Sequence, residues 1–359
     1  MTAACASTAF WKDKRVLLTG HTGFKGAWAA LWLNAMGARV SGFALAPDTD
    51  PALFTLAAVD THITSTIGDL RDAAAVASVV AAAEPEIVLH LAAQPIVRRA
   101  IADPVETIAT NVLGTAHLLD ALRNQPSVNT ILVITSDKVY FNDDAGRAFS
   151  ETDRLGGKDP YSASKAATEL ITRSFAETYF EGKGVRVATA RGGNVVGGGD
   201  YAADRIIPDI VRAVERGEAP VLRMPQATRP WQHVLDCVNG YLLHAEALAR
   251  DGATPRSLNF GPVCGEDVTV GQLTTVMLKA LGSPSQWRYE PVAGAKEMAT
   301  LAVDSSLARS ALNWRDALAG DALVDWTAQW YKDVAAGRSA YDVTMQQIAA
   351  YSSLGANSK

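Results

Sequence analysis

Hydrophobic residues in the first half of the chain form short continuous runs that alternate with longer segments of helical periodicity. The short runs, which are typical of strands, cover residues 15–19, 38–45, 87–91 and 130–135. The longer segments, in which apolar residues recur every three or four positions, cover residues 26–36, 73–83 and 105–123. Strands that are apolar throughout are buried on both faces. The pattern therefore predicts an α/β fold with a doubly wound parallel sheet between two layers of helices.

The alternation becomes less regular after residue 192. Prolines interrupt it at positions 208, 220, 225 and 230, and helical periodicity returns at residues 206–216, 235–250 and 270–281. We expect a smaller C-terminal part that is interleaved with the last strands of the sheet. The first domain is expected to cover residues 13–194 with a return segment at about 231–262, and the second to cover 195–230 and 263–350.

Composition narrows the class of protein. Of 359 residues, 48% are hydrophobic and 20% are charged, and the net charge of −5 argues against a nucleic-acid partner. No apolar run approaches the ~20 residues that span a bilayer, and the first eleven residues are too short for a signal peptide. The cysteines at positions 5, 237 and 264 show no C-x-x-C spacing. We expect a soluble cytoplasmic protein with reduced thiols, no metal site and no membrane contact.

The first predicted strand runs directly into a glycine-rich loop that opens a helix. Its residues are Gly20, His21, Thr22, Gly23, Phe24, Lys25 and Gly26. Glycines at these spacings permit a tight turn, close approach of a pyrophosphate and close packing of helix on strand, while the helix N-terminus favours phosphates. Strand, loop and helix together predict the dinucleotide site of a Rossmann-type fold rather than a structural turn. The G-x-x-G-x-x-G spacing is the short-chain dehydrogenase form.

The choice between NAD and NADP stays open at the end of the second strand. The carboxylate that usually binds the ribose hydroxyls is replaced there by Phe43, Ala44 and Leu45. Asp48 lies slightly beyond and is a possible substitute, and Lys25 could neutralise either the pyrophosphate or a 2′-phosphate. NAD is the preferred cofactor.

A Y-x-x-x-K pattern supplies the candidate chemistry. Tyr161 and Lys165 are four residues apart and therefore share one helix face. A nearby ammonium is expected to lower the pKa of the phenol and make it a usable base. An ordinary surface pair is the alternative, but the glycine loop upstream and a serine after the central strand, Ser136, favour a catalytic triad.

An additional pair, Asp137 and Lys138, follows Ser136 at the carboxyl end of that strand, where α/β sheets bind ligands. The plainer interpretation is a solvated ion pair in a loop. Hydride transfer alone needs only Ser136, Tyr161 and Lys165. The carboxylate and the amine therefore indicate a second acid/base pair.

With these features the chain resembles the sugar-nucleotide 4,6-dehydratases of the extended short-chain dehydrogenase/reductase superfamily. The resemblance extends from about residue 10 to 236, and more weakly to about 340. It rests on TGHTGFKG (19–26), GDLRD (68–72), HLAAQPIVR (90–98), TSDKVY (135–140), DPYSASK (159–165), RGGNVVGGGD (191–200) and RPWQHVLD (229–236). Relatives acting on TDP- and GDP-sugars typically carry Asp-Glu where this chain has Asp137-Lys138, which favours the branch that acts on CDP-glucose.

The resemblance implies a mechanism. Tyr161, assisted by Lys165 and Ser136, would remove the proton from the C-4 hydroxyl of the sugar while hydride passes to NAD. Lys138 would then take the C-5 proton, Asp137 would protonate the leaving C-6 hydroxyl, and hydride would return to C-6. The product would be a 4-keto-6-deoxy sugar. A neutral Lys138 needs burial or nearby cations.

The resemblance also implies binding residues and partners. Asp69 and Leu70 would contact adenine, and Ala92 and Ala93 would line the cofactor channel. Contacts to the sugar nucleotide are assigned to Gln94, Arg98, Asn194, Arg205, Arg229 and His233. The segment 13–194 would hold NAD, and the C-terminal segments would hold the sugar nucleotide. A homodimer through the helices at 105–123 and 161–180 is expected.

Two alternatives remain. A sugar-nucleotide 4-epimerase or decarboxylase shares the glycine loop and the Tyr161/Lys165 pair but does not need Asp137 and Lys138. A non-catalytic NAD-binding protein would usually lack the tyrosine, the lysine or the serine, and this chain has all three.

Overall fold

The computed structural model describes residues 3–143, 146–263, 268–291 and 301–356. Within these residues, seven parallel strands form one sheet in the order β11-β6-β5-β4-β1-β2-β3. The strands are β1 (Arg15–Thr19), β2 (Arg39–Ala44), β3 (Thr64–Ile67), β4 (Ile87–His90), β5 (Thr130–Ile134), β6 (Arg186–Gly192) and β11 (Ser257–Phe260). The predicted doubly wound α/β fold is confirmed.

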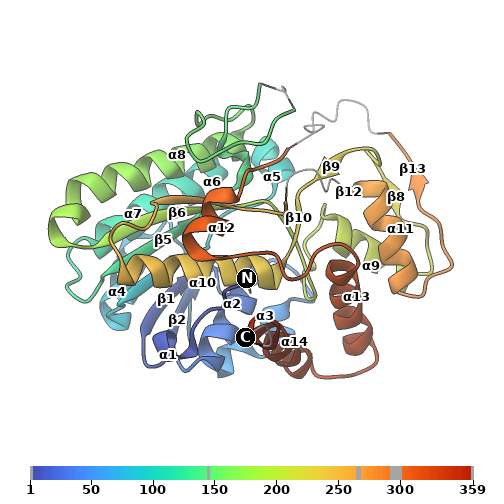
Figure 1. Cartoon of the computed structure of the whole chain (residues 1–359), viewed down its shortest axis with the longest axis horizontal. Coiled ribbons are helices and arrows are strands. Elements are labelled where there is room, and N and C mark those ends of the chain that lie inside the picture. Colours follow the sequence, from blue (N-terminus) through green and yellow to red (C-terminus); the bar gives the residue numbers. More distant parts are fainter. Residues whose placement is uncertain (1–2, 144–145, 264–267, 292–300, 357–359) are drawn as a thin grey trace.

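Helices cover both faces of this sheet (Figure 1). One face carries α2 (Phe24–Ala35) and α10 (Val234–Arg250); the other carries α4 (Ala73–Ala83), α7 (Gly114–Leu122) and α8 (Pro160–Phe175). Successive side chains of each strand point to opposite faces of the sheet. Leu17 therefore packs with α4 and α7, while Val16 and Leu18 pack with α2 and α10. This double burial explains why the strands are apolar throughout.

Two glycines hold helix α2 close to the first strand. Gly20 has a φ of +79°, and a Cβ there would lie 2.7 Å from the backbone N of Ala92. A Cβ on Gly26 would lie 2.0 Å from the carbonyl oxygen of Gly20. No larger residue fits at either position, so the loop keeps its backbone accessible next to the start of α2.

The start of α8 is fixed by the residues before the Y-x-x-x-K pattern. Asp159 caps the helix by accepting from the backbone N of Ser162 at 3.0 Å and from its hydroxyl at 2.6 Å. Pro160 occupies the first turn, where its missing N–H costs nothing. The cap fixes where the first turn of α8, with Tyr161, begins.

The C-terminal half adds three small strand pairs beside the sheet. They are β7 (Asn194–Val196) with β10 (Trp231–His233), β9 (Thr228–Arg229) with β12 (Val268–Thr269), and β8 (Val221–Leu222) with β13 (Arg288–Tyr289). The helices of this half are α9 (Ile206–Glu215), α11 (Val270–Ala280), α12 (Ser306–Leu312), α13 (Asp321–Ala335) and α14 (Ala340–Ala356). Between β7 and α12 the chain returns once to the main sheet, at β11.

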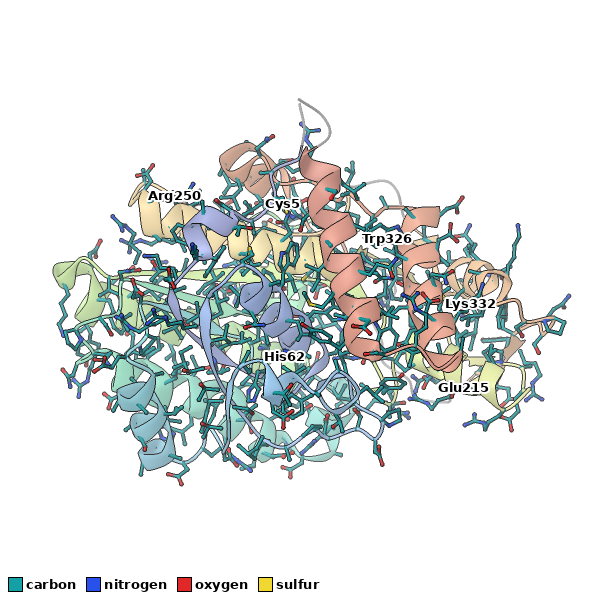
Figure 2. The ribbon with its side chains drawn as sticks, turned by 90° about the horizontal axis from the view of Figure 1, so that it is seen from below. Cys5, His62, Glu215, Arg250, Trp326 and Lys332 are labelled. Atoms are coloured by element: carbon teal, nitrogen blue, oxygen red, sulfur yellow. The ribbon has the colours of Figure 1, made fainter. Side chains whose placement is uncertain are left out.

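The last helices fold back onto the N-terminal half (Figure 2). Helix α14 packs on α2 and α3 (Leu53–Leu56), and the ring of His62 stacks on Tyr341 with centroids 4.1 Å apart. Asp236 of α10 accepts hydrogen bonds from the backbone N atoms of Ala317 and Leu318, and from the hydroxyl of Tyr351. Helix α10 therefore anchors the end of the described chain.

One predicted helix is interrupted. The segment 105–123 consists of α6 (Pro104–Ile108), a π-helical turn η2 (Ala109–Leu113) and α7. The carbonyl of Asn111 accepts from the hydroxyls of Thr115 and Thr168, which compensates for the irregular backbone bonding.

The remaining short helices are α1 (Thr8–Trp11), η1 (Val59–Thr61), α5 (Val97–Ala102), η3 (Asp137–Val139), η4 (Ala176–Phe180) and η5 (Glu181–Lys183). No helix in the described part of the chain is long and apolar enough to cross a membrane.

Candidate active site

Two adjoining cavities open at the carboxyl ends of the strands. The larger has a volume of about 610 Å³ and the smaller about 250 Å³. The residues that line both cavities are Phe24, Lys25, Pro95, Thr135, Tyr161, Asp200 and Arg205. A molecule in one cavity would therefore meet a molecule in the other across Tyr161.

The smaller cavity collects the residues predicted to bind the cofactor. Those that line it are Gly20, Thr22, Gly23, Phe24, Lys25, Gly26, Asp69, Leu70, Ala92, Ala93, Tyr161 and Lys165. His21 is the exception. Its ring is fully buried against Gly42, and its Nε2 lies 2.7 Å from the hydroxyl of Ser65. Burial lowers the pKa of His21 to about 4, so the ring is a neutral structural group away from the cavity.

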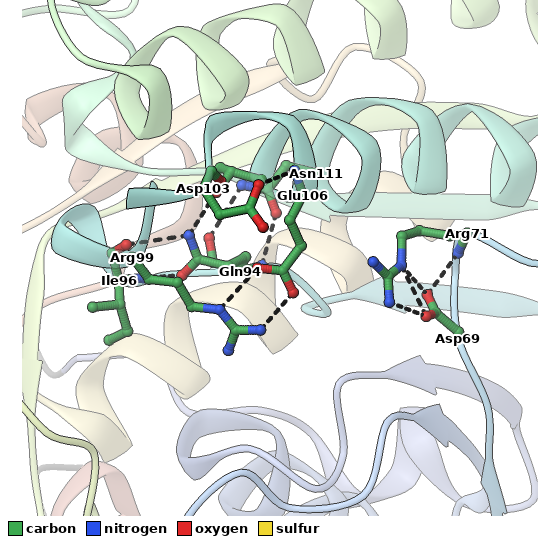
Figure 3. A network of polar contacts seen from close by, with 9 residues as sticks. Asp69, Arg71, Gln94, Ile96, Arg99, Asp103, Glu106 and Asn111 are labelled. Atoms are coloured by element: carbon green, nitrogen blue, oxygen red, sulfur yellow. Dashed lines mark hydrogen bonds and ion pairs between the residues drawn. The ribbon is translucent and has the colours of Figure 1, made fainter. Parts of the chain in front are cut away.

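Two of the acidic side chains that line the smaller cavity are Asp48 and Asp69. Asp48, the possible substitute for the missing ribose carboxylate, follows β2 and lines the cavity together with Ala44 and Leu45. Asp69 accepts from Arg71 at 2.8 Å, and this contact lowers the pKa of its carboxyl (Figure 3). The Asp69 side chain is thus engaged locally.

Tyr161 and Lys165 lie one turn apart on α8, and both are buried. Burial raises the pKa of Tyr161 to about 12, against the lowering effects of a hydrogen bond with Ser136 and the charge of Arg205. Burial and the charge of Lys25 lower the pKa of Lys165 to about 7. The predicted lowering of the Tyr161 pKa by Lys165 is therefore wrong: burial outweighs the nearby cations, and the Lys165 amine donates to the carbonyl of Ile134 at 3.2 Å.

Asp137 and Lys138 lie on η3 directly after β5, on the wall of the larger cavity. Asp137 is 2% exposed; its Oδ1 accepts from the hydroxyl of Ser136 at 3.0 Å and its Oδ2 has no hydrogen-bond partner. Burial raises the pKa of Asp137, against the charges of Lys138, Arg229 and Lys25. A buried carboxyl with a raised pKa and an unpartnered oxygen is suited to donating a proton.

Three of the predicted substrate residues line the larger cavity: Asn194, Arg205 and Arg229. Arg205 forms an ion pair of 2.9 Å with the buried carboxylate of Asp200. Arg229 donates to the carbonyl of Thr228 at 2.7 Å. The two guanidinium groups give this cavity the local cations that a diphosphate requires, despite the net negative charge of the chain.

Comparison with known proteins identifies the family. Residues 17–327 match the model of the GDP-mannose 4,6 dehydratase family. The chain belongs to this family. It is 39% identical to the CDP-glucose 4,6-dehydratase of Salmonella typhimurium over 350 residues, 96% of this chain and 98% of the relative. It is 31% identical to a dTDP-glucose 4,6-dehydratase of Mycolicibacterium smegmatis, over 89% of this chain and 93% of that protein.

Solved structures show the same fold. An epimerase from Methanothermobacter thermautotrophicus superposes with a TM-score of 0.79 at 20% identity, over 94% of this chain and 96% of that one. A UDP-glucose 4-epimerase from Thermotoga maritima with UDP-glucose gives a TM-score of 0.77 at 20% identity, covering 89% of this chain and 99% of the epimerase chain. At this identity the likeness concerns the fold alone.

Not all residues that the family resemblance assigned to the substrate lie in the larger cavity. Gln94 lines the smaller cavity, and both ends of its amide are used: it donates to Thr107 at 2.8 Å and accepts from the backbone N of Ile96 at 2.6 Å (Figure 3). Gln94 therefore fixes the loop after β4. Arg98 lines neither cavity; it is exposed and pairs with Asp204 at 2.7 Å.

His233 is a further correction. It is fully buried outside both cavities, and its Nδ1 accepts from the backbone N of Leu235 at 3.2 Å, which caps α10. Its ring lies against Trp326 with centroids 6.3 Å apart, and burial lowers its pKa to about 3. His233 is thus a neutral helix cap rather than a phosphate ligand.

Sequence reasoning missed other parts of the site. Arg223, Trp231 and Glu290 line the end of the larger cavity formed by the small strand pairs. Strands of two or three residues carry no periodic signal, so nothing in the pattern placed these side chains together. Asp200, which forms the ion pair with Arg205, could have been predicted as a site residue because it ends the RGGNVVGGGD motif. Among the described residues, no group of three or more His, Cys, Asp or Glu side chains could hold a metal.

Proposed function

We propose that the protein converts CDP-glucose to CDP-4-keto-6-deoxyglucose with NAD as cofactor. One observation carries this proposal: Asp137 and Lys138 share the larger cavity with Tyr161, which also faces the smaller cavity. An elimination needs an acid and a base in addition to the group that serves hydride transfer. The 39% identity over nearly the whole of a CDP-glucose 4,6-dehydratase supports the same reaction.

NAD fits the smaller cavity. The glycine loop leads directly into the N-terminus of α2, and a Cβ on Gly20 or Gly26 would collide with the backbone of Ala92 or of Gly20, so the glycines keep strand, loop and helix close together. Bound NAD would supply the hydride acceptor for C-4 and return the hydride to C-6. Asp48, Asp69 and Leu70 would hold its adenosine end, and the loop N–H groups with Lys25 its pyrophosphate. Solved relatives include a UDP-glucose 4-epimerase of Thermus thermophilus in complex with NAD.

Tyr161 and Lys165 would act together on the C-4 hydroxyl. With a pKa of about 12, Tyr161 holds its proton at neutral pH, whereas Lys165, at about 7, is partly a neutral amine. The phenol would take the C-4 proton as its own proton moves toward Lys165. Ser136, which hydrogen-bonds with Tyr161 and Asp137, would orient the same oxygen.

Asp137 and Lys138 would carry out the elimination. Lys138 would remove the C-5 proton, which the neighbouring ketone acidifies, and would give a proton back to C-5 when hydride is added at C-6. Asp137, whose pKa burial raises, would donate a proton to the departing C-6 hydroxyl. Arg205 and Arg229 would bind the diphosphate, with Asn194 beside them. The base would then reach the end of the cavity near Arg223 and Glu290.

A homodimer in the cytoplasm completes the proposal. The exposed apolar side chains of α6, η2 and α8 support pairing of these helices between two copies: Val105, Ile108, Leu113 and Leu170 are each about half exposed or more. Sedimentation equilibrium of the wild type and of Leu170→Glu tests the interface.

Cys5 and Cys237 are free thiols, as in a reducing compartment, and Cys264 lies outside the described residues.

The decisive experiment supplies the purified protein with NAD and, separately, with CDP-, TDP-, GDP- and UDP-activated hexoses. Formation of a 4-keto-6-deoxy sugar is followed by its alkali-induced absorbance and by mass spectrometry. We expect product with CDP-glucose. Release of C-4 epimers without loss of water would replace the dehydratase by an epimerase, and binding of NAD with no turnover would indicate a non-catalytic protein.

A further inference from the structure

An arginine–glutamate ion pair forms part of the wall of the smaller cavity. Arg99 of α5 and Glu106 of α6 both line this cavity. The guanidinium donates two parallel hydrogen bonds to the carboxylate, from Nε to Oε2 at 2.9 Å and from Nη2 to Oε1 at 2.5 Å (Figure 3). Arginine uses the same two-point geometry to bind phosphate groups. A cofactor in this cavity therefore meets a phosphate-binding side chain that is already occupied.

Asp103 holds the two partners at this spacing. Its carboxylate accepts from the backbone N of Glu106 at 2.9 Å and so caps α6, and its backbone N donates to the carbonyl of Arg99 at 2.7 Å. Only 20% of the Glu106 side chain is exposed. The cap and the two-point contact fix the pair before a cofactor binds, unlike the single contacts between freely exposed side chains that contribute little.

A second ion pair of the same kind is formed by Asp69, which also lines the smaller cavity. The carboxylate of Asp69 accepts from Nε of Arg71 at 2.8 Å and from Nη2 at 2.5 Å (Figure 3). The guanidinium of Arg71 is therefore neutralised by its neighbour, as that of Arg99 is by Glu106.

The surroundings of Arg99 are acidic beyond its direct partner. The negative charges of Glu106, Asp48 and Asp103 all act on its guanidinium. Asp48, which lines the cavity after β2, forms no ion pair within the part of the chain that the structure describes. A further anion placed beside Arg99 would meet more negative than positive charge.

We propose that the Arg99–Glu106 ion pair makes the protein selective for NAD over NADP, because Glu106 occupies the guanidinium that would otherwise bind the 2′-phosphate of NADP. The end of β2 leaves this choice open, since it carries Phe43 and Ala44 in place of the usual carboxylate. The proposal concerns the cofactor alone and does not depend on which sugar nucleotide the protein converts.

The two cofactors differ only in this phosphate. NAD presents neutral ribose hydroxyls, which an unpaired carboxylate such as Asp48 can bind, whereas a 2′-phosphate requires an arginine. The phosphate carries close to two negative charges. To reach Arg99 it would have to displace Glu106, and the displaced carboxylate would then lie unpaired beside a dianion. Like charges placed together in this way are a strong barrier to binding.

The test compares Glu106→Gln, which removes the carboxylate charge and keeps the side-chain shape, with the double variant Glu106→Gln/Arg99→Met, which also removes the guanidinium. Glu106→Ala serves as a second variant in case the glutamine amide still holds Arg99. Glu181→Gln is the matched control, because Glu181 pairs with Arg256 at 2.8 Å outside both cavities. Dissociation constants for NAD and NADP are measured by isothermal titration calorimetry on protein freed of bound cofactor, and thermal unfolding is followed on the same preparations.

We expect the wild type to bind NAD about 100-fold more tightly than NADP or better. Glu106→Gln should bind NADP about tenfold more tightly than the wild type does, the effect of removing a unit charge roughly 10 Å away at an effective dielectric constant near 20. Its affinity for NAD should change by less than about twofold. The double variant should lose the gain, because the guanidinium that binds the phosphate is gone. A role in stability alone would weaken both cofactors alike and leave their ratio unchanged.

An unchanged ratio of the two dissociation constants in both Glu106→Gln and Glu106→Ala overturns the proposal. A gain in NADP binding that persists in the double variant also overturns it, because the 2′-phosphate would then not bind Arg99. An equal gain in Glu181→Gln would reduce the effect to one of net charge and overturn it as well. Cofactor binding needs no sugar nucleotide, so failure to turn over CDP-glucose would refute the proposed reaction and leave this inference intact.

Discussion

Two buried carboxylates at the same edge of the sheet have opposite surroundings. Glu169 of α8 accepts from the hydroxyls of Thr135 and Thr189 at 2.5 and 2.8 Å, and forms a two-point ion pair with Arg191, with bonds of 3.0 and 2.8 Å. Asp137, just beyond Thr135, has one oxygen bonded to Ser136 and one without a partner. Both side chains are almost inaccessible to solvent.

The different bonding of these two carboxyl groups indicates different roles, one in stabilising the fold and one in chemistry. A carboxylate whose oxygens are fully bonded holds β5, β6 and α8 in register. A carboxyl left partly unbonded in a cavity costs stability and keeps a site for a proton. The fully bonded glutamate therefore supports the helix that carries Tyr161 and Lys165, and the partly bonded aspartate lines the larger cavity.

The largest effect is expected for Glu169→Gln. This change leaves the guanidinium of Arg191 buried without its countercharge, so we expect the free energy of unfolding to fall by about 3–5 kcal/mol. Urea denaturation followed by circular dichroism measures it. The double variant Glu169→Leu/Arg191→Met should lose less than the single variant. A single variant as stable as the wild type would show that the ion pair does not hold this region.

Asp137→Asn should show the reverse behaviour. We expect kcat for the 4-keto-6-deoxy product to fall by about 100-fold or more, because the elimination loses its acid. Stability should stay the same or rise, since an ionisable group with an unpartnered buried oxygen is removed. Enzymatic turnover and thermal unfolding are measured on the same preparation. Loss of stability together with unchanged kcat would make Asp137 a structural residue.

Asp236 extends the comparison to a carboxyl that is bonded to neutral donors instead of a cation. Burial raises its pKa to about 7 from the usual 3.8. The folded state therefore holds a proton that the unfolded state has released between these values, and stability should fall as pH rises. We expect a loss of about 1 kcal/mol per pH unit between pH 5 and 6.5 that is missing in Asp236→Asn. Identical slopes for both proteins would place the Asp236 pKa near its ordinary value.

The smallest effect is expected for His233→Asn. Asparagine can still cap α10, so the free energy of unfolding should change by about 1 kcal/mol. We expect kcat/KM to change by less than about twofold. Arg229 lies on β9 and lines the larger cavity, so Arg229→Met is the matched comparison and should raise KM for the sugar nucleotide. A large rise in KM for His233→Asn would return this residue to the substrate site.

The regular part of the molecule could be predicted from the sequence because its signals are local. The apolar runs gave β1, β4 and β5, and the glycine loop and the Y-x-x-x-K pattern lie where strands end and helices begin. The polar edge strand β3 gave no such signal, since its TSTI sequence is mostly exposed. A sequence motif also does not show whether its side chains are buried in the folded protein. This is why the neutral cap His233 and the buried His21 resembled ligands until their surroundings were known.

The path of the chain has a consequence for protein engineering. Strand β11 completes the sheet beside β6, yet in the chain it lies between the small strands at the end of the larger cavity, with β8 and β9 before it and β12 and β13 after it. Neither half is therefore continuous, and a cut near residue 194 would leave the sheet without its edge strand. A chimaera that exchanges the C-terminal half between relatives would need splice points on both sides of β11.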